Sequence, residues 1–288
     1  MAVLQDGDFE LDGYLFSGSR RQPLYVLGFN IEPARTRVQD VPNPMAPELR
    51  QGRDQRTPPL WQFGFRVGHG GAAATLSRLA GLTTAWNALT AVPDAESVLR
   101  YAIAGRTRRV YGRAREMSPD YSMVYDLGRV VATGDFQPRD VWLYDDDIQS
   151  LTVSLIPTST RGLKSPLKAP LTTAQGAQRQ GQVTIGGDAP APVELEFKGP
   201  IINPVASSTG WEVGLNLTLA YDQTVTVNTR TGTVRRNDGV NLAGVLTRRT
   251  YLPEARMQPG ARELIFAGTD PTGTATCTMR WRNTYQSL

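Results

Sequence analysis

The chain has 288 residues, of which 40% are hydrophobic and 20% are charged. This length and composition are those of a globular protein with room for two domains, and they exclude a disordered chain. No segment reaches the roughly 20 apolar residues of a transmembrane helix, and the first residues lack the basic and apolar regions of a secretory signal. We therefore expect a protein that contacts no membrane and stays in a cytoplasm until it is assembled.

The first predicted elements are paired strands over residues 9–16 and 24–27, where apolar side chains alternate or cluster. Residues 32–59 follow, and we name this segment the arm. It holds six prolines, many charges and few apolar residues, which predicts an irregular structure. Connections of this length are uncommon inside compact domains and are usually functional or disordered.

Strict alternation over residues 61–67 predicts a strand with one buried face. His69, the only histidine, lies between glycines, which is typical of an exposed turn and not of a catalytic group. A helix is predicted over about residues 72–90, and its apolar stripe is expected to pack on a sheet. The stripe consists of residues three or four apart: Leu76, Leu79, Leu82, Trp86 and Leu89.

Two strand-like runs, 98–104 and 109–113, predict a hairpin that turns at residues 105–107. Residues 124–136 predict one or two further strands, interrupted at residues 133–135. Residues 106–115 form the densest positive cluster of the chain and include Tyr111, so they could contact phosphates and stack on bases. Because charges along a strand alternate between two faces, a solvated or subunit-facing strand is the favoured interpretation.

Three adjacent carboxylates, Asp145, Asp146 and Asp147, could bind calcium, which prefers oxygen ligands. They lack the alternating spacing of a calcium loop, so a solvated charge run near the junction of two domains is favoured. A strand is predicted over residues 148–157. Residues 158–182 are rich in Ser, Thr, Pro, Gly and Gln and contain no aromatic residue, which predicts a loop near the boundary.

The remainder of the chain is predicted to be an antiparallel sandwich, because short strands alternate with frequent turn signals. The predicted strands cover residues 193–197, 211–221, 224–228, 233–236, 263–267 and 274–281. Cys277 is the only cysteine, which excludes an intrachain disulfide and a multi-cysteine zinc site and predicts a small buried side chain.

No nucleophile and base can be identified in this chain, and no glycine-rich phosphate-binding motif follows a strand and opens a helix. We therefore predict that the protein is not an enzyme. No catalytic residue, cofactor or metal-binding residue is predicted.

Several separated motifs resemble the distal tail protein (Dit) family of long-tailed, siphovirus-type phages, and their order gives the resemblance its weight. The strongest one closes the strand at residues 193–197 and reads Gly199-Pro200-Ile201-Ile202-Asn203-Pro204. The other motifs in the C-terminal half cover residues 225–232, 257–266 and 279–282. Those in the N-terminal half cover residues 84–87, the hairpin around Gly105, residues 135–138 and residues 142–144.

The resemblance implies a mainly β fold with two domains. Residues 1–147 would form a tail-tube-like, ring-forming β barrel or sandwich with one α-helix, and residues 148–288 a galectin-like antiparallel β-sandwich. It further implies a structural protein of the virion, located at the tail tip or baseplate and assembled in the host cytoplasm. Six copies would form a hexameric ring that joins the tail tube to the host-recognition apparatus and lets DNA pass without specific binding. The implied partners are the tail tube protein, a tail-tip hub or tail-associated protein, and receptor-binding proteins.

Within this interpretation the arm would reach a neighbouring subunit, and Arg50, Arg53 and Arg56 are its candidate interface residues. An alternative interpretation is a carbohydrate-binding adhesin that uses the C-terminal sandwich. Its candidate residues for stacking on a sugar are Trp211, Tyr221 and Trp281, each in a predicted strand where core packing is favoured.

Overall fold

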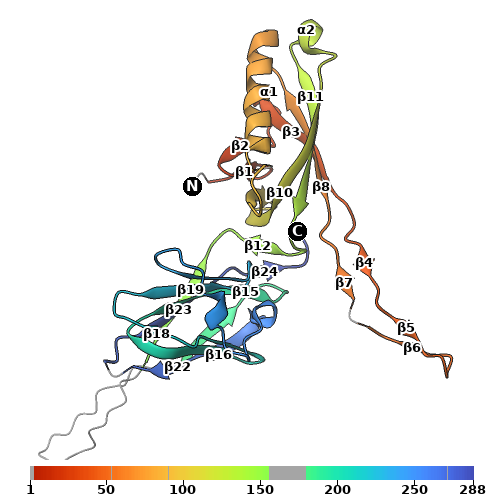
Figure 1. Cartoon of the computed structure of the whole chain (residues 1–288). Helices are drawn as coiled ribbons and strands as arrows, with labels where there is room; N and C mark the ends of the chain where they lie inside the picture. Colours follow the sequence, from red (N-terminus) through yellow and green to blue (C-terminus); the bar gives the residue numbers. More distant parts are fainter. Residues whose placement is uncertain (1–2, 53, 90, 156–179, 271) are drawn as a thin grey trace, which may run out of the picture. The chain divides into compact units, whose positions relative to one another are not determined.

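A computed structural model describes residues 3–52, 54–89, 91–155, 180–270 and 272–288 (Figure 1). The chain divides into two compact units. The N-terminal unit comprises Met1–Asp146 together with Gln286–Leu288, and the C-terminal unit comprises Asp147–Tyr285. Most of the predicted loop over residues 158–182 lies outside the described residues, and residues 180–182 open a strand.

The N-terminal unit is built on one antiparallel sheet with the strand order β2-β1-β9-β10-β11-β8-β3. A short strand, β12, adds to β10. Its strands are β1 (Phe9–Leu11), β2 (Tyr14–Phe16), β3 (Leu24–Ile31), β8 (Trp61–Val67), β9 (Ser97–Ile103), β10 (Arg106–Asp120), β11 (Val130–Pro138) and β12 (Leu143–Asp145).

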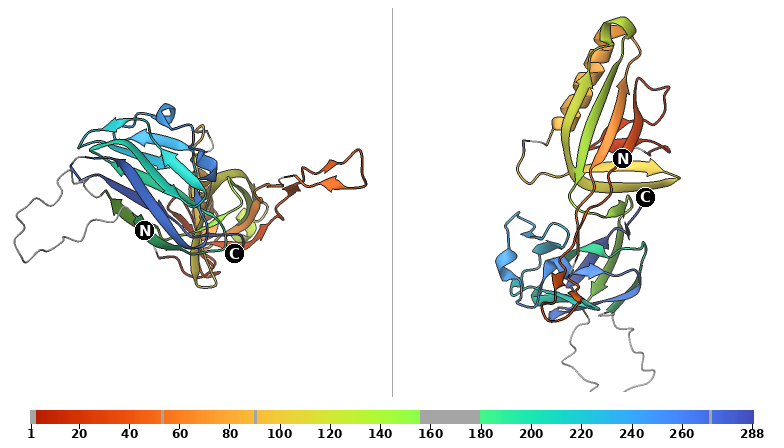
Figure 2. Two further views of the ribbon diagram at one scale, coloured as in Figure 1. Left: turned by 90° about the horizontal axis from the view of Figure 1, so that it is seen from below. Right: turned by 90° about the vertical axis from the view of Figure 1, so that its right-hand side faces the viewer.

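Helix α1 (Gly71–Asn87) confirms the predicted helix and ends three residues before the predicted limit. It lies along the sheet, as the right-hand view of Figure 2 shows, and buries Leu79, Leu82 and Trp86. The Trp86 ring meets the Phe65 ring at a centroid distance of 5.4 Å. Three of the five residues of the predicted stripe are therefore core packing, whereas Leu76 is half-buried and Leu89 lies beyond the end of the helix.

Two predictions for the β10–β11 region are wrong. Residues 124–127 form a short helix, α2 (Val124–Leu127), where a strand was predicted. Strand β11 runs through residues 133–135 without interruption. Gly134 signals a close approach here instead of a break, because a Cβ at this position would lie 2.9 Å from Cζ2 of Trp86.

The arm is not irregular, as was predicted, but a narrow ribbon of four short strands that continues the β3–β8 pair (Figures 1 and 2). Its strands are β4 (Thr36–Arg37), β5 (Val41–Pro42), β6 (Leu49–Arg50) and β7 (Gln55–Arg56), with β4 paired to β7 and β5 to β6. Proline has no N–H group for a ladder, so Pro42 and Pro44 restrict the pairing of β5.

The C-terminal unit is an antiparallel sandwich of two sheets. One sheet has the order β13-β23-β15-β19-β20, with β21 beside β15, and the other has the order β14-β22-β16-β17, with β18 beside β16. The strands are β13 (Gln149–Ser154), β14 (Gln180–Ile185), β15 (Ala191–Lys198), β16 (Ile201–Ser208), β17 (Trp211–Gly214), β18 (Thr218–Leu219), β19 (Thr224–Asn228), β20 (Thr233–Arg236), β21 (Arg256–Met257), β22 (Gly260–Thr269), β23 (Thr276–Trp281) and β24 (Thr284–Tyr285). Two short 3₁₀ helices, η1 (Ala243–Val245) and η2 (Leu252–Glu254), lie between strands.

One hydrophobic core joins the two sheets of this unit. Phe197 of β15 and Phe266 of β22 bring their ring centroids to 6.1 Å from each other, and both side chains are fully buried. Buried side chains from both sheets fill this core, which confirms the mainly β fold predicted for the C-terminal half.

Candidate functional site

The arm is a two-stranded ribbon without a core of its own, and its tip exposes apolar side chains to solvent. Val41 is 60% exposed, Met45 92% and Leu49 65%. The tip is nonetheless an ordered hairpin, because the Asn43 amide donates to the Glu48 carbonyl at 2.9 Å and the Asn43 side chain accepts from the Met45 amide at 3.2 Å. Exposed apolar groups on an ordered extension are typical of a surface that packs on a partner.

The base of the arm is fixed to the sheet. Glu32 donates its amide hydrogen to the Leu60 carbonyl at 2.9 Å, directly beyond the last β3–β8 register pair. The Gln137 side chain of β11 donates to the Pro58 carbonyl at 3.2 Å. The arm therefore leaves the N-terminal unit from a defined point.

Two of the three arginines proposed for the arm, Arg50 and Arg56, lie on different strands of the ribbon. Arg50 is exposed on β6, where it lies opposite Val41 of β5. Arg56, exposed on β7, donates to Oε1 of Gln286 at 3.5 Å. Arg53 lies outside the described residues. The sequence analysis missed the apolar tip residues, although Val41, Met45 and Leu49 lie in a segment with few other apolar residues.

A second feature lies inside the N-terminal unit, where the positive cluster of β10 was expected to be solvated or subunit-facing. That interpretation is wrong for Arg108 and Arg109, which are 3% and 6% exposed. Arg109 lies opposite Arg100 of β9, which in turn lies opposite Glu10 of β1. Two like charges directly opposite each other destabilise a sheet, so this pair needs a counter-charge.

Asp146 supplies that counter-charge, which corrects the interpretation of its acidic run as merely solvated. Arg100 donates to Oδ1 of Asp146 through Nε at 3.0 Å and to Oδ2 through Nη2 at 2.7 Å. Arg109 donates to Oδ1 through Nε at 3.0 Å, and Arg100 also donates through Nη1 to Glu10 at 2.9 Å. We name Glu10, Arg100, Arg109 and Asp146 the Asp146 network.

The network changes the acidity of the Asp146 carboxyl. Burial acts to raise the pKa of Asp146, but the hydrogen bonds from Arg100 and Arg109 and their positive charges outweigh it, so the pKa lies below its usual value. The carboxylate is consequently charged throughout the neutral range. A buried charge set of this kind is a structural connection between strands and contains no group poised for proton transfer.

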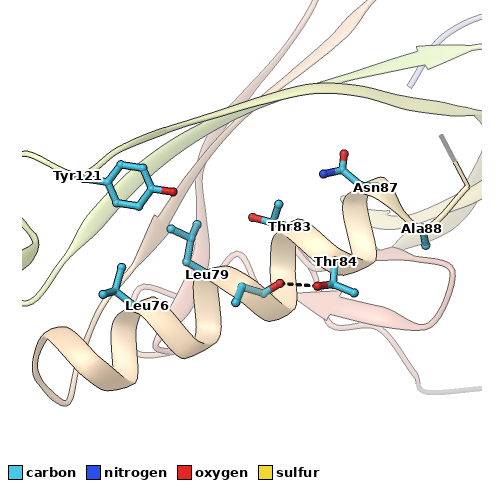
Figure 3. A pocket seen from close by; sticks show the side chains of 8 residues that line it. Leu76, Leu79, Thr83, Thr84, Asn87, Ala88 and Tyr121 are labelled. Carbon is cyan, nitrogen blue, oxygen red and sulfur yellow. Dashed lines mark hydrogen bonds between the residues drawn. The ribbon is translucent and has the colours of Figure 1, made fainter. Parts of the chain in front are cut away.

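A groove of about 650 Å³ lies between α1 and the residue that follows β10, Tyr121 (Figure 3). Leu76, Leu79 and Thr83 of the helix face Tyr121, which follows β10. Thr84 turns away and donates its hydroxyl hydrogen to the Ala80 carbonyl at 2.8 Å. The lining is uncharged and mixes apolar side chains with the polar ones of Thr83, Thr84, Asn87 and Tyr121.

The residues proposed for sugar stacking differ sharply in exposure. Trp211 is 9% exposed and Trp281 6%, and both belong to the core of the sandwich. Burial leaves neither ring with a free face on which a sugar could stack. Tyr221, in contrast, is 71% exposed, in the turn that follows β18.

Other candidate groups can be placed briefly. Cys277 is fully buried, and burial raises the pKa of its thiol above the usual range. His69 is exposed in the turn before α1. Among the described residues, no group of three or more His, Cys, Asp or Glu side chains is positioned to hold a metal ion. None of the described helices is long and apolar enough to cross a membrane.

No family model matches the chain, and no curated protein matches it either. Solved structures do. The Dit protein of phage SPP1, described as a paradigm of the hub adsorption apparatus of phages that infect Gram-positive bacteria, superposes with a TM-score of 0.60 at 10% identity, over 96% of this chain and 98% of that one. A chain of the phage P2 baseplate in its activated conformation, solved with Ca and with Sr, superposes with a TM-score of 0.57 at 9% identity, over 98% of this chain and 99% of that one.

Both units of the chain therefore take part in the likeness, because the superposed region covers nearly the whole length of each protein. At this level of identity the superposition concerns the path of the backbone and not the chemistry of particular side chains. The resemblance expected from the sequence motifs is thus confirmed: this chain has the fold of the phage Dit hub and baseplate proteins.

Proposed function

We propose that the protein is a structural component of a phage tail tip. The observation that carries this proposal is the superposition on hub and baseplate chains over nearly the full length of both partners. A domain inserted into an unrelated protein would match only in part, whereas here both compact units match together. The absence of a recognisable nucleophile and base in the sequence agrees with a structural role.

In this proposal six copies close into a ring that joins the tail tube to the host-recognition apparatus, and DNA passes through its centre. The N-terminal unit forms the ring, and the C-terminal sandwich mounts further tail-tip proteins. A closed ring needs a head-to-tail interface in which two different surfaces of the same chain meet. The arm supplies one of those surfaces, because Val41, Met45 and Leu49 are exposed on an ordered hairpin that leaves the unit from a fixed base.

Deletion of the arm tests the role in ring closure, and the structure indicates how to make the deletion without disturbing the sheet. Glu32 and Leu60 form the last hydrogen-bonded pair of the β3–β8 ladder. Replacing residues 33–59 by Asn-Gly would close this pair with a two-residue turn of the kind that suits a hairpin. Solution mass and negative-stain images should show rings for the full chain and folded single subunits for the deletion variant.

A finer variant tests the tip alone. Leu49→Asp places a charge on the exposed apolar tip and should abolish ring closure. Val240→Asp, a matched change at an exposed valine of the C-terminal unit, should leave the rings intact. Rings formed by the deletion variant would sink the arm hypothesis. A full chain that forms no ring, alone or when mixed with the tail tube protein, would contradict the proposed function itself.

A further inference from the structure

The chain crosses twice between the two units, after Asp146 and after Tyr285. The residues next to these crossings on the N-terminal unit are bound by two successive residues of β10, Arg108 and Arg109. Successive side chains of a strand point to opposite faces of the sheet. One short piece of β10 thereby binds both crossings, one from each face.

The first crossing is held through the Asp146 side chain and its backbone. Arg109 donates through Nη2 to the Asp146 main-chain carbonyl at 3.3 Å, in addition to its bonds to the carboxylate. Arg100 binds both carboxylate oxygens from the neighbouring strand. Because Asp146 is the last residue of the N-terminal unit at this crossing, no free segment remains between the anchor and the crossing.

The second crossing is held where the chain returns to the N-terminal unit. Arg108 donates through Nη1 to the Ser287 carbonyl at 2.6 Å, and its side chain is buried. Arg56 of the arm donates to the Gln286 side chain at 3.5 Å. The last residues of a domain are ordinarily poorly ordered unless they are tied down, and here a buried arginine ties them down.

Stability alone is a weak reason for this arrangement. Replacing a buried ion pair by apolar side chains of similar volume is often neutral or stabilising. Arginines, unlike apolar side chains, fix the position of the group that they bind, because a guanidinium binds a carboxylate or a carbonyl in a fixed geometry. The placement of these groups at both crossings, and the binding of backbone carbonyls as well as a carboxylate, indicate that they fix the course of the chain.

We propose that Arg100, Arg108 and Arg109 form a clamp that anchors both crossings to the N-terminal unit and thereby restricts the motion of the C-terminal unit. With both anchors in place, each crossing begins at a fixed atom. Releasing the second anchor lengthens the free connection there, and releasing the first leaves that crossing with only the main-chain bonds of β12 and of the Asp146 amide to β10. Either change should widen the range of positions that the C-terminal unit can sample. This proposal does not depend on ring formation and concerns the single chain.

Single-molecule energy transfer between one dye on each unit tests the clamp. Arg20→Cys and Asp222→Cys place the dyes on exposed positions of the two units. The native Cys277 is fully buried and does not compete for the label in the folded protein. Working at high dilution keeps the chains single.

Three variants release the clamp: Asp146→Asn, Arg108→Gln, and a chain that ends at Tyr285. Each should widen the distribution of transfer efficiencies relative to the labelled chain that carries only the two cysteine substitutions. Arg108→Lys, which keeps a hydrogen-bond donor, should widen it less than Arg108→Gln. Leu82→Ala is the control, because Leu82 is a buried residue of α1 and takes no part in the hydrogen bonds at either crossing. It should lower the melting temperature without widening the distribution.

Circular dichroism and thermal melting establish that each variant is folded at the temperature of the measurement. The shortened chain keeps every residue of the Asp146 network, so it tests the clamp even if Asp146→Asn fails to fold. Unchanged width in the folded Arg108→Gln variant and in the shortened chain would overturn the proposal. Equal widening by Leu82→Ala would also overturn it, because the effect would then reflect lost stability only.

Discussion

Gly134 of β11 lies directly against the indole ring of Trp86 on α1: a Cβ at residue 134 would be 2.9 Å from Cζ2 and 3.1 Å from Cε2 of that ring. The indole is held in place by its own hydrogen bond, from Nε1 to the Arg115 carbonyl at 3.1 Å. The close approach of helix and sheet in the N-terminal unit therefore depends on residue 134 being a glycine, which has no Cβ.

Gly134→Ala should destabilise the N-terminal unit by about 1–3 kcal/mol, because the added methyl group overpacks a filled core and the indole cannot move without losing its bond. Gly64→Ala is the matched control on the neighbouring strand β8, where the nearest atoms to an added Cβ lie at 3.7 Å. Chemical denaturation measures both changes. A Gly134→Ala variant as stable as Gly64→Ala would contradict the packing described for Trp86.

Asp146→Asn should lower the free energy of unfolding of the N-terminal unit by about 3–5 kcal/mol, the usual cost of removing one partner of a buried ion pair. Arg100 would keep Glu10, but Arg109 would lose its carboxylate. Arg236→Gln removes the exposed pair with Asp238 and serves as the comparison, with little measurable effect expected. If both variants lowered the melting temperature equally, the buried ion pairs of the Asp146 network would contribute no more to stability than the exposed pair.

The stability difference between the wild-type chain and Asp146→Asn should depend on pH in a defined direction. Hydrogen bonds from Arg100 and Arg109 hold the pKa of Asp146 below its usual value of 3.8 despite the opposing effect of burial. The contribution is therefore fully present above pH 3.8 and is lost as the pH falls through the lower folded-state pKa. Melting temperatures measured from pH 7 downwards should differ by a constant amount until about pH 4 and converge below it. Convergence already near neutral pH would contradict the lowered pKa.

Trp211→Ala should destabilise the C-terminal unit by about 3–5 kcal/mol, because the side chain is buried in the core of the sandwich. Tyr221→Ala should change stability by no more than about 0.5 kcal/mol, because Tyr221 is exposed. Denaturation curves distinguish the two. Any binding of sugars by this unit is accordingly tested with Tyr221→Ala, since a loss caused by Trp211→Ala would not separate a missing contact from an altered fold.

Local patterns in the sequence predicted the elements whose burial is periodic. A stripe of five apolar residues predicted α1, and the helix buries three of them, Leu79, Leu82 and Trp86. Alternation predicted β8 and most strands of the sandwich. These patterns succeed because a helix or strand with one buried face must repeat its apolar residues at the period of its own geometry. The ordered motifs in both halves also predicted the likeness to Dit proteins, which the structural superposition confirms for the fold.

The pairing of charges could not be predicted, because it joins residues far apart in the sequence. Glu10, Arg100 and Asp146 meet only when β1, β9 and β10 take adjacent places in the sheet and β12 brings Asp146 to them. Before folding, an arginine in a positive cluster and an aspartate in an acidic run are each best placed in water, which is the interpretation that both received. In the folded chain these side chains are instead largely buried and paired with one another.

Composition, periodicity and motif order by themselves determined that this protein is mainly β, that one long helix covers a sheet, and that the chain lacks a recognisable catalytic pair. Tertiary structure alone decided that the arm is an ordered ribbon with an apolar tip, that Gly134 makes room for an indole ring, and that β10 binds both crossings of the chain. The physical reason is range. Backbone geometry and amphipathicity act between neighbours along the chain, whereas close packing and the satisfaction of buried charges act between residues that only the completed fold brings together.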